Sequence, residues 1–218
     1  MSRPRSSMTR QYPVSVAELR DRLADTRLPD DPTDVMLPAT AQSWPQDMLE
    51  ALTATLKPAG VLIPVRQNGG QLSVLLTRRS AELKHHAGQI SFPGGRMEPD
   101  DEDIAATALR ETHEEVGIEP ESVSVLGHLE PMPTITGYAV TATVGLVAEG
   151  TSLVVDRNEV EVAFDVPLEF LLDPKNARQL KRTWNGRSIP TVEFRYSEHR
   201  IWGATANMLI ELQKKLSK

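Results

Sequence analysis

The 218-residue sequence contains no cysteine, and aromatic residues make up only 5% of it. Without cysteine there is no disulfide framework and no thiolate metal site, so any metal must be held by oxygen or imidazole ligands. No run of eighteen apolar residues occurs, so the sequence offers no candidate for a transmembrane helix. The first ten residues carry three arginines but lead into no apolar segment, and we expect a frayed tail there and no secretory signal.

Basic residues are outnumbered by acidic ones, and the formal net charge is −6. Such a balance argues against a protein that coats a nucleic-acid backbone, and we expect neither a nucleic-acid nor a membrane partner. A small anionic substrate is compatible with this charge, because a ligand responds to the local field of its pocket. The hydrophobic content of 39% and charged content of 25% are ordinary for a globular protein, which we expect to be cytoplasmic.

The order of predicted elements indicates an α+β fold with one main domain. Strands are predicted from β-branched and apolar runs at residues 59–67, 72–79, 123–131 and 138–148. Asn-Gly-Gly between the first two runs predicts a hairpin, and a second hairpin is predicted over 178–196 with Asn185-Gly186 as its turn. Helices are predicted from apolar residues at helical spacing over 14–26, 45–56, 98–117 and 203–216. Residues 1–50 are interpreted as a helical and irregular N-terminal extension, and residues 51–218 as the main domain, a mixed sheet flanked by helices.

The helix predicted at residues 98–117 is unusually rich in acids. Asp100 or Asp101 is suited to cap its N-terminus, and Gly117 to end it. One apolar stripe suits packing against a sheet and consists of Ala105, Leu109, Thr112 and Val116.

A different face of this helix carries Glu111 and Glu115 one turn apart, with Glu114 beside them and Arg110 four residues before Glu114. Like charges at this spacing destabilise a helix, but Mg²⁺ is usually held by one or two carboxylates together with water and phosphate oxygens. We therefore interpret the acids as a divalent-cation site. A solvated acidic face is the alternative that this segment alone leaves open.

The segment before the helix favours the cation site. Residues 93–95 read Pro-Gly-Gly, a tight bend at which backbone can come close to a ligand. Such a bend, followed at fixed distance by Arg-Glu-x-x-Glu-Glu-x-Gly, is a far more specific signal than either part alone.

At these residues the sequence resembles the Nudix hydrolases. The positions that match their signature are Arg110, Glu111, Glu114, Glu115, Gly117 and Ile118. Thr112 replaces the usual aliphatic residue, and the spacer from Gly95 to Glu102 is one residue longer than the standard one. Asp101 stands at the nominal spacing, so the upstream acid is left open between Asp101 and Glu102.

Residues 75–95 resemble the additional motif of the coenzyme A pyrophosphatase branch. The matching positions are Thr77, Arg79, Ser80, Leu83, His86, Gly88, Gln89, Phe92, Pro93, Gly94 and Gly95, with Lys84 in place of an arginine. The resemblance covers roughly residues 57–212 and implies an α/β/α sandwich around a mixed sheet. It also implies cleavage of coenzyme A or its derivatives to 3′,5′-ADP and 4′-phosphopantetheine, with Mg²⁺ or Mn²⁺ as cofactor.

The resemblance assigns roles to individual residues. Catalysis is expected from Arg110, Glu111, Glu114 and Glu115, with the three glutamates and the Gly95 carbonyl as metal ligands. Substrate binding is expected from Arg79, Lys84, His86, Gln89 and Gly94. Glu114 is left open as metal ligand or proton acceptor, and nothing in the spacing selects Glu159 or Glu161 as a further acid.

Two other functions compete: hydrolysis of another nucleoside diphosphate derivative, such as ADP-ribose, a dinucleotide or a nucleotide sugar, and non-enzymatic binding. The partner is then a small pyrophosphate-containing molecule, and the oligomeric state is open, with a homodimer as one option.

Overall fold

The computed structural model describes residues 15–82, 86–184 and 186–217. Its centre is a mixed sheet whose main path runs β3-β2-β1-β7-β5, with β8 also paired to β2, β4 to β1 and β6 to β7. The strands of this sheet are β1 (Lys57–Asn68), β2 (Gln71–Arg79), β3 (Ile90–Ser91), β4 (Gly94–Arg96), β5 (Val123–His128), β6 (Met132–Pro133), β7 (Tyr138–Val147) and β8 (Val160–Pro167).

The hairpin predicted from Asn-Gly-Gly is confirmed. β1 and β2 pair antiparallel up to Asn68 and Gln71, and the two intervening glycines both have positive φ, as this tight turn requires. β1 runs parallel to β7, so the sheet is mixed. The strands predicted near residues 123 and 138 are also present, as β5 and β7.

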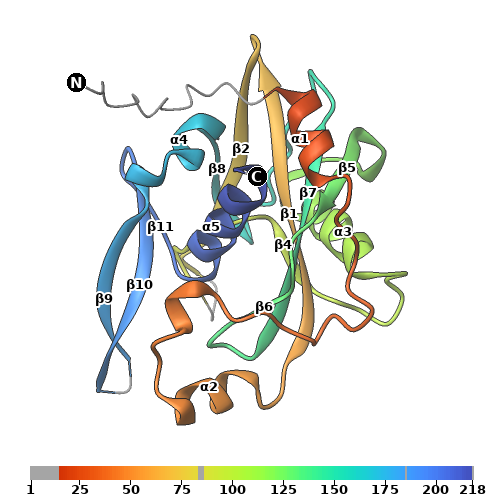
Figure 1. The fold of residues 1–218 in the computed structure, drawn as a ribbon. Coiled ribbons are helices and arrows are strands. Elements are labelled where there is room, and N and C mark those ends of the chain that lie inside the picture. Colours follow the sequence, from red (N-terminus) through yellow and green to blue (C-terminus); the bar gives the residue numbers. More distant parts are fainter. Residues whose placement is uncertain (1–14, 83–85, 185, 218) are drawn as a thin grey trace, which may run out of the picture.

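Helices cover both faces of the sheet (Figure 1). Helix α3 (Ile104–Val116) packs on one face, while α1 (Val16–Leu23) and α5 (Ala204–Leu216) contribute leucines to the core on the other. Successive residues of β1 point to opposite faces of the sheet, one toward the core and the other toward α3. Ile63 and Val65 point into that core, whereas Gly60 faces α3. The predicted α/β/α arrangement is confirmed.

A second, three-stranded sheet lies beside the main one and comprises β9 (Arg178–Trp184), β10 (Arg187–Tyr196) and β11 (His199–Trp202). The hairpin predicted over residues 178–196 is β9 and β10, although Asn185 of its predicted turn lies outside the described residues. The chain enters this sheet through α4 (Leu168–Leu172). Three short 3-10 segments complete the described elements: Ala39–Ala41, Pro120–Ser122 and Pro174–Asn176.

The N-terminal segment is anchored to the main sheet. A capping box of Ser15 and Glu18 starts α1, and α2 (Gln46–Thr53) begins directly after Pro45. Leu19 and Leu23 are fully buried in the same core as β1 and β7. The division at residue 50 stays a prediction, but α1 contributes directly to the core of the main sheet. None of the described helices is long and apolar enough to cross a membrane.

We expect Leu23→Ala to lower the free energy of unfolding by about 2–5 kcal/mol, because it leaves a cavity in the shared core. Urea denaturation followed by circular dichroism measures the change. Arg20→Ala, on the exposed side of the same helix, is the control and should change stability by less than about 0.5 kcal/mol. Equal effects of the two substitutions would show that α1 is not part of the core.

Candidate active site

The acidic helix starts and ends at well-defined residues. Its N-cap is Asp103, whose carboxylate accepts hydrogen bonds from the amides of Ala105 and Ala106, both at 2.8 Å. The cap predicted at Asp100 or Asp101 is wrong, because the Asp101 side chain is already engaged with other partners. The predicted end is confirmed: Gly117 has a φ of 70° and donates to the His113 carbonyl at 2.8 Å.

Helix α3 lies close against β1 because Gly60 has no side chain. A Cβ at this position would overlap the carbonyl oxygen of Ile104. Of the predicted apolar stripe, Ala105, Thr112 and Val116 are buried, but Leu109 is only half-buried and Ala108 is fully buried in its place.

Thr112, unusual at an aliphatic position, is accommodated by its own helix. Its hydroxyl donates to the carbonyl of Ala108 at 2.6 Å and therefore has a partner despite full burial. The residue packs like a valine, and this explains how the departure from the signature is tolerated.

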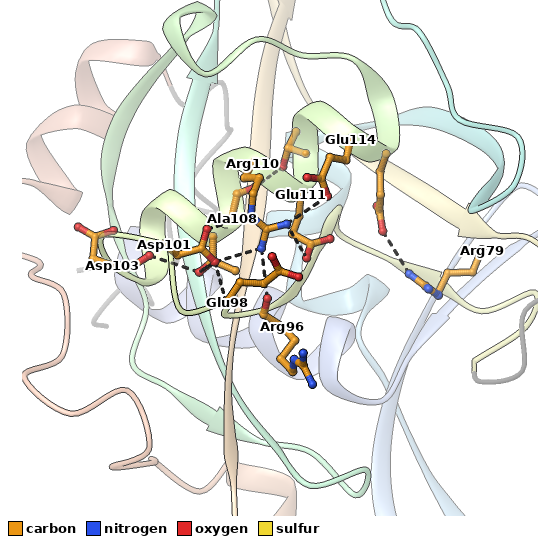
Figure 2. A network of polar contacts seen from close by, with 12 residues as sticks. Arg79, Arg96, Glu98, Asp101, Asp103, Ala108, Arg110, Glu111 and Glu114 are labelled. Atoms are coloured by element: carbon orange, nitrogen blue, oxygen red, sulfur yellow. Dashed lines mark hydrogen bonds and ion pairs between the residues drawn. The ribbon is translucent and has the colours of Figure 1, made fainter.

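Arg110 organises the acids at the start of the site (Figure 2). It forms a two-point ion pair with Asp101, with Nε to Oδ1 at 2.9 Å and Nη2 to Oδ2 at 3.0 Å. Its Nη1 donates to both Glu111 and Glu114 at 3.1 Å. The hydrogen bonds from Arg110 lower the pKa of Asp101 far below its ordinary value. The upstream acid is thus Asp101, whereas Glu102 is exposed.

Glu111 is held against the Pro-Gly-Gly bend. A Cβ at Gly95 would overlap the present position of the Glu111 carboxylate, so the Gly95 backbone lies directly beside that carboxylate. Burial raises the pKa of Glu111, and the charge of Arg110 opposes this rise.

Glu115 is the most deeply buried of the three glutamates, with 1% of the residue exposed. Its Oε1 accepts a hydrogen bond from Nη1 of Arg79 at 3.2 Å, but its buried Oε2 has no hydrogen-bond partner among the described residues. Burial raises the pKa of Glu115 to about 8, against the opposing charge of Arg79. An unsatisfied buried carboxylate oxygen is costly, which indicates that a further group belongs at this position.

Glu159 is a site residue that the sequence did not select. Its charge raises the pKa values of both Glu111 and Glu115, so it lies within electrostatic reach of the cluster. Backbone contacts bring it there, since the Ser80 amide donates to the Glu159 carbonyl at 2.7 Å and the Asp156 amide to that of Glu115 at 3.0 Å. No residue spacing signals such contacts. Glu161 instead pairs with Arg78 at 3.0 Å.

The predicted substrate residues fall on two segments. Arg79 reaches Glu115, and Gly94 lies against β1 on the bend beside the acids. His86 and Gln89 form a turn on an exposed loop, with His86 Nδ1 and Gln89 Oε1 3.0 Å apart, and the Gln89 carbonyl accepts the Arg79 amide. Lys84 lies outside the described residues. The structure thus joins Arg79 and Gly94 to the acids and connects the loop to them through Arg79.

The donor set fits a hard divalent cation. In the part of the chain that the structure describes, no group of three or more acidic or histidine side chains is arranged to hold a metal ion. The free Oε2 of Glu115, the Glu111 carboxylate and the adjacent Gly95 backbone nevertheless offer the oxygen donors that Mg²⁺ prefers. A cation would also relieve the burial cost that raises the pKa of Glu115.

The raised pKa of Glu115 predicts how stability depends on pH. Between an ordinary value of 4.5 and about 8, the folded chain keeps a proton that the unfolded chain releases, so stability decreases as pH rises through this window. The contribution is at most about 1.4 kcal/mol per pH unit. We expect urea denaturation in EDTA to give a flatter pH dependence for Glu115→Gln than for the unchanged protein. The exposed Glu161→Gln is the control and should keep the original slope; equal slopes in all three proteins would contradict the assignment.

The comparisons with known proteins agree with this geometry. Residues 56–185 match the NUDIX domain. The chain is 42% identical over 158 residues to a protein of Photorhabdus laumondii named as an uncharacterized Nudix hydrolase, NudL, covering 72% of this chain and 84% of that protein. NudL of Citrobacter koseri is 39% identical over 160 residues, covering 73% and 83%. Among solved structures, a C. elegans Ap4A hydrolase is 21% identical, with 52% of this chain and 82% of that chain covered and a TM-score of 0.42.

The NUDIX match spans more than half of the sequence and includes the Pro-Gly-Gly bend, the acidic helix and Arg79. Together with the identity to relatives along most of their length, it shows that the chain belongs to the Nudix hydrolase family, enzymes that act on pyrophosphate bonds and generally use divalent metal ions.

Proposed function

We propose that this Nudix hydrolase cleaves the pyrophosphate of coenzyme A or its derivatives to 3′,5′-ADP and 4′-phosphopantetheine or its acylated form, with Mg²⁺ or Mn²⁺. The observation that carries the hydrolytic part is the buried, unsatisfied Glu115 oxygen beside Glu111 and Gly95. The coenzyme A part is supported by the motif at residues 75–95. Arg79 of this segment pairs with Glu115, and the segment ends at the Pro-Gly-Gly bend.

In this proposal, Glu111, Glu115 and the Gly95 carbonyl hold the cation. When bound, the cation neutralises pyrophosphate charge and lowers the pKa of water. Arg110 keeps Glu111 and Glu114 in place while its two-point pair with Asp101 fixes its own position. Glu114 is about half exposed and is held by a single contact, so it is free to turn toward the cation or to accept a proton from the attacking water.

Arg79 links the acids to the substrate. One of its terminal nitrogens binds Glu115, which leaves the other available to a phosphate oxygen. Gly94, His86 and Gln89 are proposed to contact the substrate from the bend and from the loop that follows Arg79. Lys84 is proposed for the same role from the sequence alone. The substrate is thus a small molecule, and cytoplasmic localisation and a homodimer stay predictions.

With Mg²⁺ or Mn²⁺, we expect the purified protein to convert coenzyme A into two phosphorylated products, because the acids would hold the cation and Arg79 beside them would bind the pyrophosphate. Chromatography with mass spectrometry identifies the products, and EDTA should abolish the reaction. Intact coenzyme A together with rapid cleavage of ADP-ribose or a dinucleotide would favour the alternative substrate class. No cleavage of any pyrophosphate would contradict the proposed function.

We expect Glu115→Gln to lower kcat by about two to four orders of magnitude, since the amide keeps the shape of the side chain but removes the charge that holds the cation. Steady-state kinetics on coenzyme A measures the loss, and circular dichroism checks that the variant is folded. Glu161→Gln is the matched control, because Glu161 is exposed and pairs with Arg78 and not with Arg79 or Arg110 in the described structure. A Glu115→Gln variant with unchanged kcat would exclude Glu115 as a metal ligand.

A further inference from the structure

The outer face of the three-stranded sheet is strongly basic. Paired residues on neighbouring strands share a face, which here joins Glu193 to Arg178 and Trp202, and Arg195 to Arg200. The opposite face, with Val192, Phe194 and Ile201, is buried in the core. We call the outer set the arginine face, and it consists of Arg178, Arg182, Arg195, Arg200, Trp202 and Glu193. In Figure 1 this sheet and α3 lie on opposite sides of the drawing, and β11 contacts β3 at the edge of the main sheet.

A buried acid positions two of these arginines. Glu193 is 4% exposed, and its two oxygens accept hydrogen bonds from Nε of Arg195, at 2.7 Å, and Nε of Arg200. Burial alone would raise the pKa of Glu193, but the hydrogen bonds and charges of Arg195 and Arg200 outweigh it and lower that pKa. Glu193 thus orients two guanidinium groups through their Nε atoms, and no hydrogen bond joins their terminal nitrogens to it in the described structure. The side chains of Arg195 and Arg200 are 55% and 44% exposed.

An aromatic ring positions a third arginine. The guanidinium carbon of Arg182 lies 3.9 Å from the centroid of the Trp202 ring, and that of Arg200 lies 5.7 Å from it. Arginines from β9, β10 and β11 are thus brought together on one surface. Within the described residues, the terminal nitrogens of Arg182, Arg195 and Arg200 donate to no acid and no carbonyl.

Two other arginines of this region are paired differently. Arg187, which the same register puts at the far end of this face, and Arg78 each have an acid of their own, Asp47 and Glu161. On the arginine face, several guanidinium groups share the single charge of Glu193, although the whole chain carries a net charge of −6. The repulsion among them would be relieved by an anion.

We propose that the arginine face binds the phosphate groups of a small-molecule ligand. Guanidinium groups grip phosphate oxygens through paired hydrogen bonds, and their fixed orientation lowers the entropy cost of binding. Single-stranded nucleic acid fits less well, because base stacking needs an open aromatic face and Arg182 already lies over Trp202. A second copy paired along β9 also fits poorly, because the central Lys181 would meet its own equivalent.

The probe for this proposal is tripolyphosphate, titrated into the full-length protein in EDTA at low salt. The indole N–H resonance of Trp202, assigned with Trp202→Phe, reports binding at the face. We expect a saturable shift in the unchanged protein and affinity weakened by about tenfold or more in Arg182→Gln/Arg200→Gln. Arg20→Gln, an exposed arginine of α1, is the control and should bind as the unchanged protein does. Equal affinity in the double variant would overturn the proposal.

Glu193→Gln separates an organised site from diffuse positive charge. The substitution raises the net positive charge of the face but weakens the positioning of Arg195 and Arg200, so an organised site predicts weaker binding and diffuse charge predicts equal or tighter binding. Thermal unfolding checks that the variant is folded. Arg182→Lys keeps the charge but removes the paired donors, so it repeats the test without touching the buried acid. A single-stranded oligonucleotide that displaces tripolyphosphate at lower concentration would reassign the face to nucleic acid. Because no turnover is measured and no metal is present, the outcome is independent of the proposed hydrolysis.

Discussion

The close approach of α3 to β1 is the constraint on which the candidate active site depends. Gly60 allows the helix backbone to touch the strand, and Gly95 allows the Glu111 carboxylate to touch the bend. With a side chain at position 60, the backbone of the helix would stand farther from the strand, and with one at position 95 the Glu111 carboxylate would have to move away from the bend. The acidic face and the bend are therefore held together by a backbone contact at Gly60 and by the contact of the Glu111 side chain with Gly95.

Charge within this unit is divided between two arginines with different tasks. Arg110, tied to Asp101, holds the more exposed acids Glu111 and Glu114. Arg79, from the end of β2, reaches the buried Glu115 and satisfies only one of its oxygens. These two arginines offset part of the negative charge of the acids, and a bound cation would offset the remainder. Structural ion pairs such as that of Arg187 and Asp47 leave no comparable deficit.

Patterns within one element predicted the structure well, whereas contacts between elements did not follow from them. The β1–β2 hairpin and α3 up to Gly117 were predictable because period-two alternation, a turn signal and a helix-ending glycine are local. The N-cap was mispredicted because several neighbouring acids suit a cap, and only the pairing of Asp101 with Arg110 removes that residue from the choice. Glu159 enters the cluster through backbone bonds, and the arginine face arises from the register of three strands; neither leaves a local trace in the sequence.

The contact of the N-terminal segment with β5 has a consequence beyond core packing. β5 is the last strand on its side of the main sheet, and the hydroxyl of Thr26 accepts the His128 amide at 2.8 Å, while Gly127 leaves room for α1 to approach. Exposed strand edges recruit strands from other molecules, and native proteins often cover them. The first described helix and Thr26 therefore cover one end of this edge, at Gly127 and His128, so their detachment would expose more of the strand to pairing with other molecules even with an intact set of acids.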